Sequence, residues 1–258
     1  MAPVVAVHSF RRGTGKSTLV ANLATLLAVA GKRIGVVDAN LEAPSLPGLL
    51  GYEPRALTPT LNDFLGGRCT LRAAAQEMTN QLGSTPAGRL FLIAAAADGA
   101  LGRKAGSDYD LVRLDAELRE LVNELKLDAV FLDTRSGVNE ESMMALTVAD
   151  RAVVVLRLDK QDYQGTAVVI DLTRKLELPE TVLVVNPTPA TFDPRQVSAE
   201  VEKTYQCRVV SVLPFAEELM SLGGEGPFVL RHPTHPLTRL FAFLAAQLIT
   251  DGPAHGPA

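Results

Sequence analysis

RRGTGKS, at residues 11–17, is the stretch of this sequence that decides its fold. It lies between an apolar run at 4–7 and a helix-like run at 18–30. A strand, a glycine-rich turn and a helix in this order hold phosphate groups, because N–H groups of the turn and the positive helix end face the anion. Lys16 would supply a point charge for the β- and γ-phosphates, and Ser17 a hydroxyl for Mg²⁺. The stretch therefore predicts a phosphate-binding loop.

The stretch departs from the full P-loop pattern at one position. That pattern places a glycine five residues before Gly15, where this chain has Phe10. A bare Gly-Lys-Ser is common by chance, and its alternative interpretation is a turn with an exposed lysine. The apolar run before the stretch and the helix-like run after it favour phosphate binding.

Composition favours one large α/β domain. The chain has 258 residues, of which 47% are hydrophobic and 21% charged, enough for a sizeable core. Its net charge of −4 does not favour DNA as the main ligand, since nucleic-acid binders usually carry a basic excess. The two cysteines, Cys69 and Cys207, are too few and too far apart to predict a disulfide framework or a metal site built by this chain alone.

The ends of the sequence suggest a cytoplasmic protein. The N-terminus lacks the charged and apolar regions of a signal peptide, and the apolar run at 240–249 is too short to cross a bilayer. Residues 251–258, with their prolines and glycines, are expected to form a disordered tail after a single domain at 1–250.

Strand-like and helix-like runs alternate along the chain. The strands are mostly continuous aliphatic runs, which is typical of parallel strands covered on both faces. This pattern predicts a doubly wound, mostly parallel sheet flanked by helices. Strands are expected at 4–8, 33–38, 90–94, 129–133, 152–156, 181–186 and 208–213, and helices at 16–30, 109–125, 140–149, 161–176, 194–205 and 236–250. Between them, residues 41–86 are expected to form loops with short helices.

Two predicted strands end in an aspartate, Asp38 and Asp133. In a parallel sheet these ends share one edge with the phosphate loop, where carboxylates can hold Mg²⁺ or orient an attacking water. The alternative is an aspartate that caps the following helix or turn. Two such ends favour the functional interpretation. Gly137, just beyond Asp133, is predicted to offer a backbone N–H to the γ-phosphate, unless it serves only the turn.

Several segments together resemble a known family, the MinD/ParA ATPases with a deviant Walker A motif. Within it they are most similar to a MinD-like group whose loop is HSFRGGTGKS. The matching segments are SFRRGTGKST at 9–18, NLA at 22–24, VDANLEAPSL at 37–46, LDT at 132–134, GVNEE at 137–141, QDYQGT at 161–166, VVN at 184–186, FVLR at 228–231 and HPLT at 235–238. The resemblance covers most of the chain, about residues 3–245.

The resemblance implies an ATP- and Mg²⁺-binding switch that dimerises with nucleotide between its subunits and positions another cellular component. Arg11 matches a lysine that reaches the partner's phosphates, and it keeps the positive charge. Arg12 replaces a glycine, so it either projects outward, which we favour, or distorts the loop. Asn40 replaces a second carboxylate. An amide can orient a water but cannot take its proton, so slow hydrolysis or an ATP-locked state is expected.

Residue by residue, the resemblance and the strand-end argument give three sets. The catalytic set is Lys16, Asp38, Asn40 and Arg11; the metal ligands are Ser17, Asp38 and Asp133; the nucleotide-binding set is Arg11, Arg12, Gly13, Thr14, Gly15, Lys16, Ser17, Thr18, Gly137, Asn186, Pro214 and Glu217. Asn186 and the segment with Pro214 and Glu217 are implied to contact the adenine. Their alternatives are a strand-ending turn and an ordinary helix start. No chemistry is derived for residues 161–166.

Membrane and DNA are the usual partners of the family, and neither is favoured for this chain. The apolar stripe at 236–250 carries one basic residue, Arg239, and is typical of core packing rather than of a membrane anchor. Basic residues near 103–126 are interleaved with acids, which indicates a mixed solvated face.

Three hypotheses for function remain. The leading one is a slow, dimerising switch ATPase that acts on a partner protein the sequence does not identify. The second is a nucleotide-binding scaffold with little or no hydrolysis, which Arg12 and Asn40 favour. The third is a small-molecule kinase or ligase on the same fold, such as dethiobiotin synthetase, for which the sequence offers no marked substrate pocket.

Overall fold

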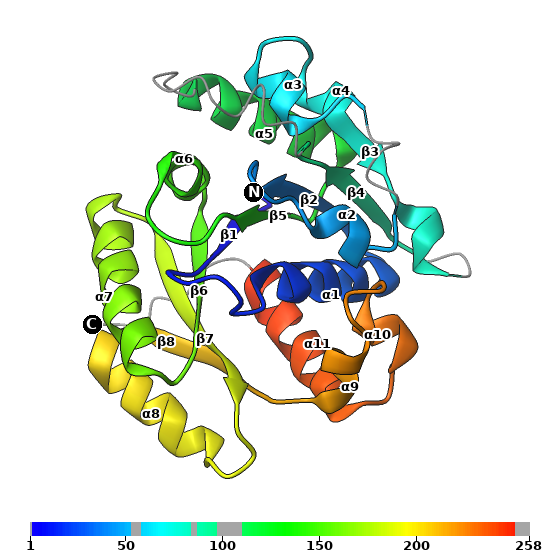
Figure 1. The fold of residues 1–258 in the computed structure, drawn as a ribbon. Helices are drawn as coiled ribbons and strands as arrows, with labels where there is room; N and C mark the ends of the chain where they lie inside the picture. Colours follow the sequence, from blue (N-terminus) through cyan, green and yellow to red (C-terminus); the bar gives the residue numbers. More distant parts are fainter. Residues whose placement is uncertain (1, 53–57, 84–86, 97–109, 251–258) are drawn as a thin grey trace.

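A parallel sheet forms the centre of the molecule (Figure 1). The computed structural model describes residues 2–52, 58–83, 87–96 and 110–250. Its eight strands follow the order β3-β4-β2-β5-β1-β6-β7-β8, and all neighbours are parallel except β3 and β4. The strands are β1 Val4–His8, β2 Arg33–Ala39, β3 Ala75–Glu77, β4 Arg89–Ile93, β5 Ala129–Thr134, β6 Arg151–Leu156, β7 Glu180–Thr188 and β8 Arg208–Pro214.

Helices cover both faces of the sheet, so the predicted doubly wound α/β fold is confirmed. Val4 and Ala6 of β1 face one apolar core, while Val5 and Val7 face the other, because successive side chains of a strand point to opposite faces. The helices are α1 Lys16–Val29, α2 Leu46–Leu49, α3 Leu61–Leu65, α4 Leu71–Ala74, the 3₁₀ turn η2 Thr79–Leu82, α5 Leu111–Leu125, α6 Glu140–Thr147, α7 Lys160–Lys175, α8 Pro194–Tyr205, α9 Glu217–Ser221, α10 Phe228–Arg231 and α11 Pro236–Ile249.

The predicted elements all occur within one or two residues of their expected bounds. Residues 41–86 contain the expected short helices and also β3, an antiparallel edge strand that the sequence did not predict. Tyr109, the tail at 251–258 and the basic residues near 103 lie outside the described residues.

The last helix packs into the core. Leu237, Phe241, Leu244 and Leu248 of α11 are buried in the same cluster as the apolar face of α1. The apolar stripe of this segment is therefore core packing, as its sequence indicated. Within the described part of the chain, no helix is long and apolar enough to cross a membrane.

The sheet brings the predicted site residues to one edge. Strands β1, β2, β5 and β7 run parallel, so their carboxyl ends lie together, next to the N-terminus of α1. In the register of the sheet, Asp133 is opposite both Val7 and Asp38. The loop after β1, the two aspartates and Asn186 consequently meet at this edge.

Candidate nucleotide-binding site

The loop between β1 and α1 has the backbone of an anion cradle. Gly13 and Gly15 adopt φ angles of 77° and 87°, in the left-handed region that side chains disfavour. Gly15 also lies against β7, where a Cβ would come within 2.5 Å of Asn186 Nδ2. No side chain caps α1, so the N–H groups of its first turn remain available to an anion.

Lys16 is buried at the centre of this cradle. Its Nζ donates to Ser9 Oγ over 3.0 Å, and Ser9 Oγ donates in turn to the carbonyl of Arg11 over 2.6 Å. Burial lowers the pKa of Lys16, while the nearby Asp133 carboxylate acts in the opposite direction. The ammonium group thus has only one neutral hydrogen-bond acceptor among the described residues, which is a suitable environment for a phosphate.

The two predicted carboxylates have different roles. Asp38 accepts backbone hydrogen bonds from Ser45, Leu46 and Asn40, at 2.9, 3.0 and 3.3 Å. It therefore organises the loop that leads to α2, which is the capping alternative considered for it. Metal binding through Oδ2 would compete with the two bonds that this oxygen accepts.

Asp133 is fully buried, and among the described residues neither of its oxygens has a partner within hydrogen-bond geometry, although the Ser17 hydroxyl lies near enough to affect its pKa. Burial raises the pKa of Asp133, an effect that the Ser17 side chain and Lys16 partly offset. Burial, and then repulsion from Asp133, raise the pKa of Asp38. Two unsatisfied carboxylate oxygens beside a serine hydroxyl fit a hard divalent cation such as Mg²⁺.

The side chain of Asn40 stabilises the loop in which it lies. Its Nδ2 donates to the carbonyl of Ala43 over 2.7 Å, and its Oδ1 accepts from Ala43 N over 3.3 Å. The amide is therefore engaged with the backbone and would have to turn to orient a water. Gly137 is engaged as well, since its N–H donates to the carbonyl of Ser9 over 3.0 Å. In this conformation the predicted contact of that N–H with the γ-phosphate is replaced by a link to the phosphate loop.

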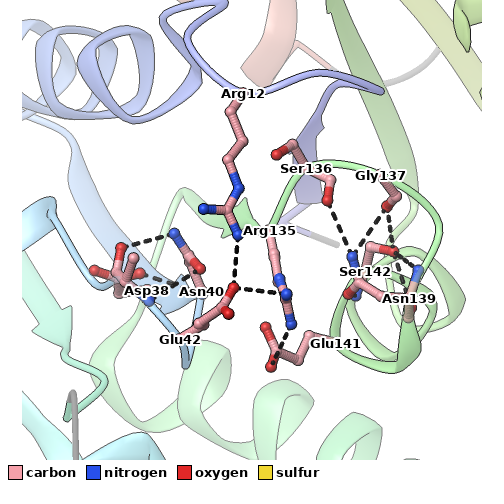
Figure 2. A network of polar contacts seen from close by, with 11 residues as sticks. Arg12, Asp38, Asn40, Glu42, Arg135, Ser136, Gly137, Asn139, Glu141 and Ser142 are labelled. Carbon is pink, nitrogen blue, oxygen red and sulfur yellow. Dashed lines mark hydrogen bonds and ion pairs between the residues drawn. The ribbon is translucent and has the colours of Figure 1, made fainter.

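Arg12 projects outward, as we favoured. Its side chain is 71% exposed, its φ is not positive, and its Nη2 contacts Glu42 Oε2 at 2.7 Å (Figure 2). The same oxygen lies 2.6 Å from Arg135 Nη2, and Arg135 Nη1 lies 3.5 Å from Glu141 Oε1. The arginine thus avoids distortion of the loop and joins an ionic network that the sequence did not indicate.

Helix α7 holds the first half of the loop. Arg11 Nη1 contacts Asp159 Oδ1 at 3.1 Å, and Asp159 caps α7 through Gln161 N and Asp162 N. Phe10 packs against Gly165, where a Cβ would come within 2.0 Å of the ring. Residues 161–166, for which the sequence offered no chemistry, therefore provide a contact surface for Phe10. Their proximity was hidden because the two segments are about 150 positions apart.

A cavity of about 410 Å³ continues from the loop. Among the predicted residues it is lined by Gly13, Thr14, Gly15, Thr18, Asn186 and Pro214. Asn186 Nδ2 donates to the carbonyl of Thr14 over 2.8 Å and fixes β7 to the loop. Glu217, at the start of α9, does not line the cavity, so its predicted adenine contact is not supported. Phe215 and Arg157, which the sequence did not single out, do line it.

Known proteins are similar to this chain in sequence and in fold. A ParA family model, described as NUBPL iron-transfer P-loop NTPase, matches residues 1–65. An uncharacterized ATP-binding protein of Methanocaldococcus jannaschii is 27% identical over 250 residues, covering 96% of this chain and 88% of the relative. The septum site-determining protein MinD of Bacillus subtilis is 31% identical over 159 residues, covering 60% and 53% of the two chains. The structure of MinD with Mg-ADP from Pyrococcus horikoshii, 22% identical, aligns with a TM-score of 0.77 over 96% of each chain.

The fold and its phosphate loop are thus those of a P-loop NTPase, in agreement with the solved structure of the same architecture. Within that class the chain is similar in sequence to MinD proteins and to the ParA family model, so the resemblance to the MinD/ParA ATPases that the sequence indicated is confirmed.

Proposed function

We propose that this protein is a nucleotide-dependent switch that binds Mg-ATP, dimerises with the nucleotide at the interface and regulates the position of another component. The observation that carries the proposal is the buried Lys16 in a left-handed glycine loop, beside a carboxylate, Asp133, whose two oxygens accept no hydrogen bond from the described part of the chain. The Mg-ADP complex of the Pyrococcus horikoshii relative supports the same cofactors.

Each residue of the cradle has a defined task in this proposal. Lys16 and the N–H groups of the loop neutralise and orient the phosphates, and Ser17 with Asp133 holds the metal ion. When bound, Mg²⁺ would neutralise charge on the phosphates. Asn186 keeps its Oδ1 as an acceptor for an adenine amino group, with Pro214 and Phe215 as apolar walls. Arg11 must leave Asp159 before it can reach a partner's phosphates.

A second candidate is a nucleotide-binding scaffold that hardly hydrolyses ATP. It is favoured by Asn40, whose amide is bonded to Ala43, and by Asp38, whose oxygens accept three backbone N–H groups. An amide cannot act as a base, and both oxygens of Asp38 already accept backbone hydrogen bonds in this conformation. A protein partner, a cytoplasmic location, and the absence of direct membrane or DNA binding stay predictions.

Binding, turnover and dimerisation measured on one sample test both candidates. We expect saturable binding of labelled ATP with magnesium, and its loss in Lys16→Ala. Light scattering should then show an ATP-dependent dimer, and phosphate release should be slow. Dimerisation without turnover selects the scaffold. No saturable binding at millimolar ATP contradicts both, provided that circular dichroism shows a folded chain.

A further inference from the structure

Four charged side chains connect three loops at the phosphate edge (Figure 2). Arg12 belongs to the phosphate loop, Glu42 to the loop after β2, Arg135 to the segment that joins β5 to α6, and Glu141 to the first turn of α6. One atom, Glu42 Oε2, receives both guanidinium groups, from Arg12 at 2.7 Å and from Arg135 at 2.6 Å. The phosphate loop and residues 135–142 are therefore joined through a single carboxylate.

Glu42 is the residue on which this ionic network depends. Arg12 and Arg135 both contact the same oxygen of Glu42, and like charges brought this close repel unless a carboxylate lies between them. The contacts also differ in exposure, since the side chain of Arg12 is 71% exposed and that of Arg135 only 29%. The less exposed end of the bridge is thus the end that leads to α6.

Residues 135–142 are connected to one another by hydrogen bonds, so a displacement of Arg135 would shift them together. Asn139 Nδ2 donates to the carbonyl of Ser136 over 3.0 Å, and Ser142 Oγ donates to the carbonyl of Gly137 over 2.8 Å. Asn139 and Ser142 also form the capping box of α6. Val138, in the middle of this segment, is 49% exposed, so its position determines what a partner would meet there.

We propose that Glu42 is a positioning residue that couples the phosphate loop to residues 135–142 through Arg12 and Arg135. The proposal rests on the proposed function, because a nucleotide bound at the phosphate loop is what would change the position of residues 135–142. The network adds to the backbone bond from Gly137 N to the Ser9 carbonyl, which ties the same two segments. With both links, a displacement of the phosphate loop is transmitted to the start of α6.

The first test needs no nucleotide. Amide hydrogen exchange of residues 135–142 is measured in the wild type, Arg12→Ala, Glu42→Gln and the double variant. Both single variants should speed exchange there by about two- to fivefold, the range for partly exposed ion pairs. The double variant should be no faster than Glu42→Gln alone. Asp171→Asn, which removes an exposed acid of α7 outside the network, is the control and should leave exchange of residues 135–142 unchanged. Unchanged exchange in Arg12→Ala would overturn the proposal.

The second test follows the coupling to the ligand. ADP and ATP dissociation constants are measured for Arg12→Ala, Arg135→Ala and their combination, each with Glu42 and with Gln at position 42. The two arginine substitutions should be non-additive by about two- to fivefold when Glu42 is present and additive when it is not. Additivity in both backgrounds refutes the role of Glu42 although nucleotide still binds. Absence of binding in the wild type refutes the proposed function, while the exchange test still decides the coupling.

Discussion

The side chain of Asn40 presents a choice between loop structure and catalysis. Its amide both donates to and accepts from the backbone of Ala43. An aspartate there could accept from Ala43 N but would face the Ala43 carbonyl with a second acceptor. We therefore expect Asn40→Asp to lower the free energy of unfolding by about 1 kcal/mol, the value of one hydrogen bond.

The same substitution should raise the rate of ATP hydrolysis. It restores a carboxylate that can take up a proton from an attacking water, a contribution of about 100-fold or more where geometry is favourable. Since the loop is disturbed, a rise of about tenfold is expected in single-turnover assays. Asn40→Ala, which supplies neither carboxylate nor amide, is the control. If Asn40→Asp hydrolyses no faster than the wild type, the missing carboxylate does not limit turnover.

Asp133 should make the stability of the nucleotide-free protein depend on pH. Burial raises the pKa of this carboxyl, so the folded chain binds a proton that the unfolded chain releases above its ordinary value of 3.8. This contribution is complete below that value and is lost as the pH rises through the folded pKa. Asp133→Asn cannot ionise at this position. Between pH 5 and pH 8 the wild type should therefore lose about 1–3 kcal/mol of its free energy of unfolding relative to this variant.

Thermal or denaturant unfolding without nucleotide measures this difference. Comparing two pH values cancels the constant cost of placing an amide at position 133. Asp63→Asn is a suitable control, because partly buried Asp63 has a pKa lowered by its backbone hydrogen bond. Its contribution is lost only as the pH falls below its ordinary value of 3.8, so this variant should keep the same relative stability at pH 5 and pH 8. A relative stability of Asp133→Asn that is equal at both pH values would show that the carboxyl is not desolvated.

At the residue scale, local patterns predicted local chemistry. Lys16 and Ser17 follow from a motif within one loop, and Asp133 from its place at a strand end. The ion pairs of Glu42 could not be predicted, because its two arginine partners lie 30 residues before it and 93 residues after it. Nothing in the sequence indicates that these positions meet in the fold. Asp38 was ambiguous for a physical reason, since a strand-ending aspartate can bind a metal or cap a turn, and here its oxygens are occupied by backbone N–H groups.

At the scale of elements, α7 supports the phosphate loop through a position without a side chain. Gly165 leaves space for the ring of Phe10, next to Arg11 and its partner Asp159. Gly165→Ala should displace Phe10 and weaken ATP binding by about two- to tenfold, because loop geometry determines how the N–H groups meet phosphate. The fold should survive, since alanine is favoured over glycine within a helix by about 1 kcal/mol.

A second substitution tests whether steric contact is the cause. Phe10→Ala in the Gly165→Ala background removes the clash and should recover part of the lost affinity, measured by calorimetric titration. Gly48→Ala, in α2 with no atom within 4 Å of the added carbon, is the matched control and should bind like the wild type. Affinity that falls further in the double variant would contradict a steric origin.

Elements were predictable in proportion to their length. The long aliphatic runs and amphipathic helices were located almost to the residue, since burial on both faces gives a strong pattern. β3 has only three residues, and it exists because Ala75 and its neighbours pair with β4 at the sheet edge. Such a strand depends on its partner rather than on its own sequence, so no periodicity could reveal it.

At the scale of the whole molecule, the candidate cavity joins the two halves of the chain. Its walls include the loop at 13–15, Leu19 of α1 and Leu49 from the N-terminal half, and Asn186, Pro214 and Phe241 from the C-terminal half. A nucleotide there would contact the phosphate loop, α1 and α2 as well as the ends of β7 and β8. Binding should therefore stabilise the fold globally rather than one loop.

The expected size of this stabilisation follows from mass action. At a ligand concentration about 100 times the dissociation constant, binding adds about 2.7 kcal/mol. For a domain of this size that amounts to a rise in Tm of about 5–10 °C, measured with magnesium and ATP. Lys16→Ala should abolish the rise. Asn186→Ala should reduce it, because it removes the bond to Thr14 and one wall of the cavity. A full rise in Lys16→Ala would place the nucleotide elsewhere and leave the phosphate loop without its ligand.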